Sequence, residues 1–361
     1  MTLSILIAGG GTGGHLYPGI AVARELMKRV PDAMVTFVGT AAGIEARVIP
    51  REGFTLDVIR SAGLKGKSLA SVARGIGLLP ASAIDAWQVI SRRRPRVVIG
   101  VGGYSSGPVV ALAATRGVPT LLMEQNAVPG LTNRLLASVV SAAAVTYTES
   151  ISFFGRKAFV SGNPVRPEFF EEAYEQQGSP PGAARVLVFG GSQGAHAINM
   201  AMVEAAARLA AATPRVAITH QTGERDLEVV RDGYRRAGLE VRVEPFLFAM
   251  DREMKSADVV VCRSGATTLA ELTAARRASI LVPFPGATDD HQRKNADVLV
   301  KAEAAVMVEQ RELTGDRLAA EVLSLASNEA RRRRMAEAAG RLARPDAARV
   351  IVDKMLELAR L

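Results

Sequence analysis

Cysteine and histidine are scarce in this chain. Its 361 residues include one cysteine, Cys262, and four histidines, none of them in a spacing typical of metal ligands. A single cysteine cannot form an intrachain disulfide or supply a cysteine cluster for zinc. The sequence therefore predicts a protein of a reducing compartment, without a protein-bound metal ion or other cofactor.

Long apolar runs are also missing. The longest, Leu135–Val145, is interrupted by serines and is far shorter than the roughly 20 residues that a membrane-spanning helix needs. No basic segment precedes the short apolar run at the N-terminus, which argues against a secretory signal. We expect a protein that is neither exported nor membrane-spanning.

The composition is that of a globular protein with a basic first half. Hydrophobic residues make up 48% of the chain and charged residues 22%, and the length predicts about two domains. The net charge is +9, and residues 60–96 alone hold eight cations and one anion, Asp85. Such a surplus indicates either a solvated basic face or an anionic partner, which could be nucleic acid, a membrane surface or a phosphorylated substrate.

Short apolar strands alternate with helices through both halves. We expect strands at 4–8, 34–38, 96–101, 120–123 and 143–146 in the first half, and at 185–189, 216–220, 241–245, 259–262 and 279–282 in the second. Continuous apolar strands separated by helices are typical of parallel sheets covered on both faces.

The two halves also repeat each other. Gly9–His15 (GGGTGGH) aligns with Gly190–His196 (GGSQGAH), and each loop follows the first strand of its half. Two Rossmann-like domains account for this repeat. We therefore predict an α/β fold of two parallel-sheet domains that face a cleft, at 1–165 and 166–345, with a C-terminal helix at 346–361 that packs back toward the first domain.

Glycine-rich loops after strands are typical of phosphate sites. Glycine lets the backbone approach a ligand, and the next helix offers N–H groups to phosphate. A third such loop is Gly102–Pro108 (GGYSSGP), and in Cys262–Glu271 hydroxyls begin a helix on which Glu271 could accept hydrogen bonds from a ribose. Tight packing of helix on strand is the alternative for each loop, but three loops together favour a ligand with a diphosphate.

A nicotinamide-dependent oxidoreductase is one alternative. Gly9–Gly14 matches G-x-G-x-x-G, but the acidic residue expected at the end of the second strand is missing, because Asp32 precedes that strand. Asp289, Asp290 and His291 are adjacent and could suggest a metal site, although a polar loop explains them better.

Seven motifs follow one another in a specific order: GGGTGGH (9–15), GGYSSGP (102–108), EQN (124–126), GNPVR (162–166), GGSQGA (190–195), RSGATTLAE (263–271) and DHQxxN (290–295). In this order the chain resembles the MurG family of bacterial UDP-N-acetylglucosamine:lipid I N-acetylglucosaminyltransferases over nearly its whole length. The resemblance implies the glycosyltransferase-B fold. It also implies inverting transfer of N-acetylglucosamine to the 4-hydroxyl of the muramyl unit of undecaprenyl-diphosphate-linked muramyl pentapeptide (lipid I), which gives lipid II for peptidoglycan synthesis.

The resemblance further implies which residues bind the substrate. They are Thr12, Gly13, Gly14, Asn126, Arg166, Ser192, Leu247, Thr268, Glu271 and Gln292. Arg166 and Ser192 would contact the diphosphate and nucleotide, and Glu271 the ribose. Met123 departs from the family, which often has histidine at this position.

An inverting transfer needs a base for the acceptor hydroxyl and positive groups for the leaving UDP. His15 is the candidate base, because its ordinary pKa near 6.5 suits proton abstraction around neutral pH. The alternative for His15 is a structural side chain that bonds to loop carbonyls.

The implied partners are UDP-N-acetylglucosamine, lipid I and the anionic cytoplasmic surface of the inner membrane, with no nucleic acid. Residues 65–96 mix apolar side chains, among them Ile76, Leu79 and the single tryptophan Trp87, with cations at both ends, as interfacial segments do; packing into the core is the alternative. A UDP-sugar 2-epimerase would leave this surface unexplained, and a nucleotide sensor or membrane scaffold would not need His15.

Overall fold

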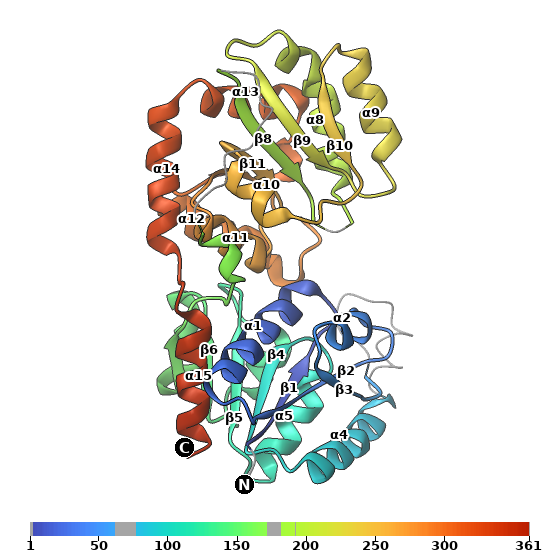
Figure 1. Ribbon diagram of the computed structural model, residues 1–361, viewed down its shortest axis with the longest axis vertical. Coiled ribbons are helices and arrows are strands. Elements are labelled where there is room, and N and C mark those ends of the chain that lie inside the picture. Colours follow the sequence, from blue (N-terminus) through green and yellow to red (C-terminus); the bar gives the residue numbers. More distant parts are fainter. Residues whose placement is uncertain (1–2, 62–76, 172–181, 192, 361) are drawn as a thin grey trace. The chain divides into compact units, whose positions relative to one another are not determined.

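The computed structural model describes residues 3–61, 77–171, 182–191 and 193–360 (Figure 1). The chain divides into two compact units. Unit 1 consists of residues 1–165 and 344–361, and unit 2 of residues 166–343. Each unit is built around its own parallel sheet, so the predicted α/β class with two parallel sheets is confirmed.

The sheet of unit 1 has the strand order β3-β2-β1-β4-β5-β6-β7, and all neighbouring strands are parallel. The strands are β1 Ser4–Gly9, β2 Met34–Gly39, β3 Thr55–Val58, β4 Val97–Gly102, β5 Thr120–Glu124, β6 Ala142–Val145 and β7 Ala158–Val160. The helices are α1 Gly13–Arg29, α2 Glu45–Arg51, α4 Leu79–Arg93, α5 Ser106–Thr115, α6 Leu131–Leu136, α7 Ile151–Phe154 and α15 Ala347–Leu358, with 3₁₀ turns η1 Thr148–Ser150 and η2 Gly155–Lys157. Because the strands are parallel, their carboxyl ends all lie at one edge of the sheet.

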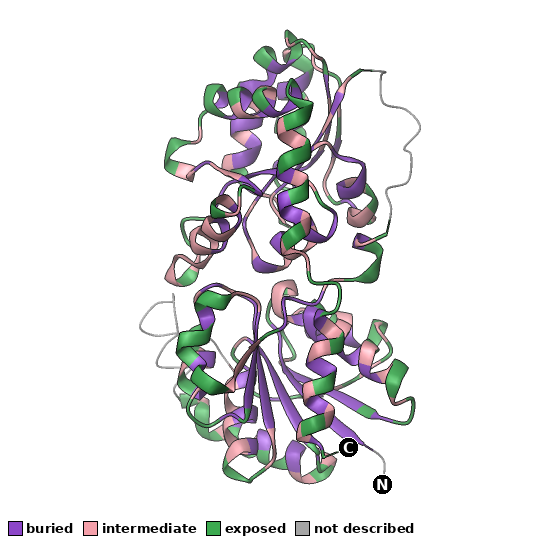
Figure 2. Ribbon diagram, turned by 90° about the vertical axis from the view of Figure 1, so that its left-hand side faces the viewer, coloured by how far each residue is buried: buried purple, intermediate pink, exposed green. Residues whose placement is uncertain are grey.

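Helices cover both faces of this sheet. Ile5 and Ile7 of β1 lie in one apolar cluster with residues of α1 and α15, whereas Leu6 and Ala8 lie in another with residues of α4 and α5. Successive side chains of a strand point to opposite faces, so a strand covered on both sides carries a continuous apolar run. Figure 2 shows the central strands of unit 1 buried along their length.

The last helix completes the core of unit 1. Ile351, Val352 and Met355 of α15 are buried in the same cluster as α1. At the rim, Arg29 Nη1 lies 2.6 Å from Asp353 Oδ1, and Arg96 Nη2 donates to the carbonyl oxygen of Ala359 at 3.1 Å.

Unit 2 repeats the plan with the strand order β10-β9-β8-β11-β12-β13, again all parallel. The strands are β8 Ala184–Phe189, β9 Val216–Gln221, β10 Val241–Glu244, β11 Val259–Cys262, β12 Ala278–Leu281 and β13 Val306–Met307. The helices are α8 His196–Ala210, α9 Leu227–Arg236, α10 Met250–Ser256, α11 Ala266–Ala274, α12 His291–Lys301, α13 Gly315–Ala326 and α14 Glu329–Leu342, with 3₁₀ turns η3 Pro167–Phe169, η4 Thr288–Asp290 and η5 Gln310–Glu312.

The strands that the apolar runs predicted are all present, with ends shifted by a residue or two. The three that the pattern missed are β3, β7 and β13, and each lies at an edge of its sheet. Edge strands are short and partly exposed, so they carry no continuous apolar run. In the described part of the chain, no helix combines the length and apolar character needed to cross a membrane.

The packing of α15 on α1 is testable. Met355→Ala removes a fully buried side chain from the core of unit 1. We expect it to lower the free energy of unfolding by about 2–5 kcal/mol, measured by chemical denaturation. The neighbouring Lys354→Ala changes a partly exposed side chain and should shift it by less than about 0.5 kcal/mol. Equal stability of Met355→Ala and the unmutated protein would show that α15 contributes nothing to this core.

Candidate active site

Two glycine-rich loops meet at the carboxyl edge of the sheet of unit 1. The Gly10 N–H donates to the carbonyl oxygen of Gly102 at 3.3 Å. A Cβ on Gly9 would lie 2.3 Å from that oxygen, and a Cβ on Gly103 would lie 2.4 Å from the carbonyl oxygen of Gly10. Only glycine allows this approach, so the predicted loops after β1 and β4 form one continuous surface.

The first loop leads directly into α1. Thr12 is the exposed residue that precedes the helix, and Gly13 and Gly14 are its first two residues. The two glycines and His15 thus form the first turn of the helix.

His15 has a defined ring orientation. Its Nδ1 lies 3.2 Å from Gln125 Oε1, while Gln125 Nε2 donates to the carbonyl oxygen of Val101 at 3.1 Å. The second bond fixes which end of the buried amide faces the histidine, so His15 Nδ1 carries the proton that Gln125 Oε1 accepts. In the neutral ring the lone pair is then on Nε2, the nitrogen that can take up a proton.

Asn126 is held by the buried carboxylate of Glu124. Glu124 Oε1 accepts the backbone N–H of Asn126 at 2.9 Å and its Nδ2 at 3.1 Å, and Oε2 accepts from Gly130 N and Asn133 Nδ2. The EQN motif thus forms a rigid turn after β5, and Asn126 itself is half-buried.

Glu45, the first residue of α2, contributes to the first loop although no sequence pattern predicts a role for it. Its side chain is 1% exposed and lies beneath the first loop. Oε2 accepts the Gly11 N–H at 2.8 Å, and Oε1 accepts both the N–H and the hydroxyl of Thr40 at 2.8 and 2.9 Å. Burial raises the pKa of this carboxyl, but the hydrogen bonds outweigh it and hold the pKa below its ordinary value. The hydrogen bond between Glu45 and Gly11 joins residues 34 positions apart, and no local sequence motif indicates it.

The corresponding loop of unit 2 has the same close approaches. A Cβ on Gly194 would lie 1.8 Å from the carbonyl oxygen of Thr222, and a Cβ on Gly223 would lie 2.4 Å from that of Gln193. Ser192, which the resemblance assigns to nucleotide binding, lies outside the described residues.

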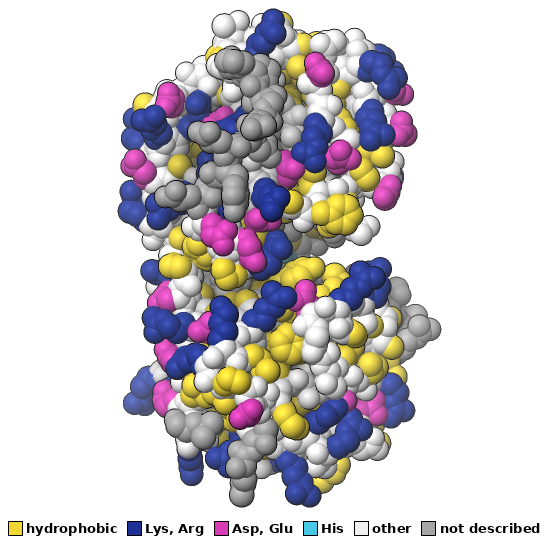
Figure 3. Space-filling view, in the orientation of Figure 1, with side chains coloured by type: hydrophobic (Ala, Val, Ile, Leu, Met, Phe, Trp, Pro, Cys, Tyr) yellow, Lys and Arg dark blue, Asp and Glu magenta, His cyan; other side chains and the backbone are white. Residues whose placement is uncertain are grey.

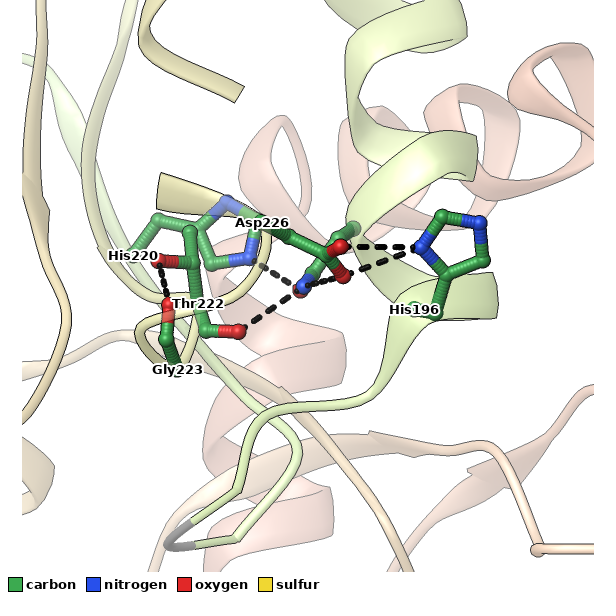
Figure 4. Close-up of polar contacts among 6 residues, drawn as sticks. His196, His220, Thr222, Gly223 and Asp226 are labelled. Carbon is green, nitrogen blue, oxygen red and sulfur yellow. Dashed lines mark hydrogen bonds and ion pairs between the residues drawn. The ribbon is translucent and has the colours of Figure 1, made fainter. Parts of the chain in front are cut away.

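A chain of buried polar groups supports this loop (Figure 4). Tyr234 OH lies 2.8 Å from His220 Nδ1, and His220 Nε2 lies 3.0 Å from Asn199 Oδ1. Asn199 Nδ2 donates to Asp226 and to the carbonyl oxygen of Thr222. Burial lowers the pKa of His220 to about 3, so this ring is neutral. At the other end, Asp226 faces the exposed ring of His196 at 3.0 Å.

Glu271 lies on α11 in a different electrostatic setting. Its pKa is raised to about 7, chiefly by burial of the carboxyl; nearby Arg166 acts to lower the pKa, and nearby Asp251 acts to raise it. Arg166 is exposed, with its guanidinium 5.1 Å from the ring of Phe169. Thr268 lies in the first turn of α11, which begins after Gly265. Within unit 2, Arg166 therefore lies close enough to Glu271 to interact with it electrostatically.

Gln221 joins two predicted binding segments of unit 2. Its Oε1 accepts the N–H of buried Leu247 at 2.8 Å, and its Nε2 donates to the carbonyl oxygen of Gly191 at 2.9 Å. The backbone group of Leu247 that remains for a ligand is its carbonyl. Beside it, Phe248 is 90% exposed and packs edge-on against Phe246, with ring centroids 5.0 Å apart.

Gln292 is the second residue of α12. Its Oε1 accepts the N–H of Phe284 at 2.9 Å, and its carbonyl oxygen accepts from Ser264 Oγ at 2.8 Å. The amide NH₂ of Gln292 is therefore the group that can donate to a ligand. Nearby, His291 Nδ1 lies 2.7 Å from the Thr288 carbonyl oxygen, and Asp290 pairs with Arg293. Within the described ranges, no group of three or more His, Cys, Asp or Glu side chains could hold a metal ion.

Comparison with known proteins places both units in one family. Residues 5–145 match the N-terminal domain of glycosyltransferase family 28, and residues 185–351 match its C-terminal domain. The UDP-N-acetylglucosamine--N-acetylmuramyl-(pentapeptide) pyrophosphoryl-undecaprenol N-acetylglucosamine transferase of Anaeromyxobacter dehalogenans (strain 2CP-C) is 51% identical, covering 99% of this chain and 94% of that protein. The protein of the same name from Myxococcus xanthus (strain DK1622) is 46% identical, covering 99% and 93%.

Solved structures agree with this assignment. The crystal structure of Acinetobacter baumannii MurG superimposes with a TM-score of 0.81 at 28% identity, covering 98% of this chain and 99% of that one. A UDP-N-acetylglucosamine 2-epimerase superimposes with a TM-score of 0.68 at 11% identity, covering 99% and 96%, a likeness of fold alone. The chain therefore belongs to glycosyltransferase family 28 and, within it, to the MurG family.

Proposed function

We propose that this enzyme transfers N-acetylglucosamine from UDP-N-acetylglucosamine to the 4-hydroxyl of the muramyl unit of lipid I, which yields lipid II for cell-wall synthesis. The observation that carries this proposal is the 51% identity, over 99% of the chain, to a transferase named for that reaction. The geometry of the two units supports a division of the work between them.

Unit 2 is proposed to hold the donor. The carboxylate of Glu271 accepts hydrogen bonds from the ribose diol, and Arg166 lies close enough to Glu271 to affect its pKa and carries a charge for the diphosphate. Thr268, in the first turn of α11, adds a hydroxyl where helix N–H groups favour an anion. The Leu247 carbonyl can accept from the N–H of uracil, and the Gln292 amide can donate to a sugar hydroxyl.

Unit 1 is proposed to supply the base. The acceptor oxygen forms a bond to the anomeric carbon, the bond from that carbon to the diphosphate breaks, and UDP leaves with the electron pair. The proton of the acceptor hydroxyl goes to His15 Nε2, which the Gln125 contact leaves as the basic nitrogen. Asn126 and the residues Thr12, Gly13 and Gly14 would line the path of the sugar.

Product analysis tests the reaction. Labelled UDP-N-acetylglucosamine incubated with lipid I should give labelled lipid II with a β-linkage and free UDP. Epimerised nucleotide sugar would instead indicate a 2-epimerase, which shares the fold. If the protein binds UDP but the labelled donor is recovered unchanged, the protein would be a nucleotide sensor.

A membrane-facing surface on α4 is proposed to bring the enzyme to its lipid-linked acceptor at the cytoplasmic face of the inner membrane. Leu79, Ile84 and Trp87 are 45%, 55% and 53% exposed, whereas Val89 and Ile90 are buried. The apolar residues of this segment therefore divide between surface and core. Ile76 and the cations Lys65, Lys67 and Arg74 lie outside the described residues.

Cations surround this part of unit 1. Arg92 and Arg94 are exposed at the end of α4, and the guanidinium of Arg116 stacks 4.2 Å from the ring of Trp87. Figure 3 shows Lys and Arg side chains at the lower right, where α4 lies in Figure 1. An apolar strip with basic neighbours is suited to the interface of an anionic leaflet.

Glu271→Gln should weaken UDP binding by about tenfold or more, because the ribose loses its charged acceptor. The same change should stabilise the fold above neutral pH. The pKa of Glu271 rises from 4.5 to about 7 on folding, so the folded state loses stability as the pH rises through this interval. Calorimetry with UDP and thermal unfolding at pH 5 and pH 8 test both effects. Unchanged UDP affinity would remove Glu271 from the ribose site.

His15→Ala should lower kcat by about 10²–10⁴-fold while UDP affinity stays within about threefold, because the base acts on the acceptor. His196→Ala is the matched control, since His196 occupies the corresponding place in the second repeat and pairs with Asp226. It should keep kcat within about threefold. A parallel loss of UDP affinity in His15→Ala would make His15 a binding residue.

The double variant Leu79→Ser/Ile84→Ser should lose most of its binding to vesicles that contain anionic lipid, with UDP affinity unchanged. Trp87 is the only tryptophan in the chain, so its fluorescence should shift to the blue on vesicle binding and return at high salt. Val229→Ser, which removes an exposed apolar side chain of α9, is the control and should bind vesicles normally. Normal binding by the double variant would place the membrane surface elsewhere.

A further inference from the structure

Glu45 is a buried charge to which the proposed reaction assigns no role. Its carboxylate accepts two backbone N–H groups, from Gly11 and Thr40, and the Thr40 hydroxyl. No ion pair joins it to any residue in the part of the chain that the structure describes. A buried carboxylate is costly unless it is hydrogen-bonded, so these backbone dipoles are what keep Glu45 ionised.

Three glycines make room for this carboxylate. A Cβ on Gly10, Gly39 or Gly43 would lie 2.5, 2.4 or 2.2 Å from the nearest atom of the Glu45 side chain. The glycines come from three segments: the first loop, the end of β2, and the turn before α2. Gly39 and Gly43 do not have a left-handed backbone, so the space for Glu45, rather than the backbone conformation, requires glycine there.

We infer that Glu45 is the positioning residue of the first loop. Its hydrogen bond to Gly11 ties the middle of that loop to β2 and α2, and the loop continues into the first turn of α1, where His15 lies. Without this tie, the loop loses its hydrogen bond to α2, and the backbone that leads to His15 can shift relative to the acceptor hydroxyl. The inference rests on the proposed role of His15.

The size of the effect follows from the geometry that proton transfer requires. A base must lie within hydrogen-bond reach of the proton it removes, and a displacement of about 1 Å can reduce the rate about 10²-fold. Because the proposed UDP site lies in unit 2, UDP binding should not depend on this loop. Loss of Glu45 should therefore reduce kcat and leave UDP affinity unchanged.

Two variants disturb the contacts of the Glu45 carboxylate in different ways. Glu45→Gln keeps the shape of the side chain but turns one acceptor into a donor that faces a backbone N–H. Gly43→Ala keeps the charge and places a methyl group where the carboxylate lies. Asp57→Asn is the matched control, because Asp57 is another buried carboxylate of unit 1 that bonds to Arg92 and Arg93 and does not touch the loop.

Hydrogen exchange measures the tie directly. In the unmutated enzyme the Gly11 amide should be protected, and in Glu45→Gln and Gly43→Ala it should exchange about tenfold faster or more. With detergent-solubilised lipid I, kcat of both variants should fall about 10- to 100-fold. UDP affinity should stay within about twofold, and Asp57→Asn should keep both Gly11 protection and kcat within about threefold.

Each alternative outcome is distinct. Unchanged Gly11 exchange in both variants would overturn the tie itself. Faster exchange with normal kcat would show that the tie does not serve the reaction. An equal loss of kcat in Asp57→Asn would assign the effect to general destabilisation of unit 1. If His15→Ala retains full kcat while the Glu45 variants lose it, the proposed base is wrong and the positioning role stands for another loop residue.

Discussion

Both units depend on one constraint: backbone segments of neighbouring loops pack directly against each other, with no side chain between them. In unit 1, Gly9 and Gly103 bring the loops after β1 and β4 into contact, and in unit 2, Gly194 and Gly223 do the same for the loops after β8 and β9. These approaches leave no space for any side chain. The loops are rigid for this reason, and the helices that follow them begin at fixed points. The glycines of the repeated motif are thus required by the packing of the loops, whether or not a ligand binds there.

Carboxylates complete what the glycines begin, and their surroundings separate them into two kinds. Glu45 and Glu124 accept backbone N–H groups of neighbouring turns and act as internal anchors. Glu271 accepts no backbone N–H group from the residues that the structure describes, and burial raises its pKa to about 7. Satisfied carboxylates hold the structure in place, whereas an unsatisfied one near Arg166 is suited to exchange hydrogen bonds with a ligand.

The sequence predicted what depends on local pattern. Continuous apolar runs marked the buried strands, and glycine-rich turns marked the loops at their ends. The edge strands β3, β7 and β13 were not predicted, because the sequence of a half-exposed strand resembles that of a loop. The sequence did not predict the hydrogen bonds made by Glu45, by Gln221 and by the polar chain from Tyr234 to His196. These contacts join segments that are separated in the sequence, and neither composition nor motif spacing indicates them. Family motifs located the candidate ligand residues, and the structure supplied the groups that support them.

The path of the chain through the two units has a consequence for the order in which they fold. Unit 2 is encoded by a single uninterrupted stretch, whereas unit 1 consists of two segments on either side of it. Proteins are made from the N-terminus at about 5–20 residues per second, and domains fold as units as they emerge. The first 165 residues are therefore made well before α15. The apolar face of α1 that α15 covers stays exposed while the whole of unit 2 is made. Unit 2 can complete its core first, and unit 1 closes only after Ile351, Val352 and Met355 have been synthesised.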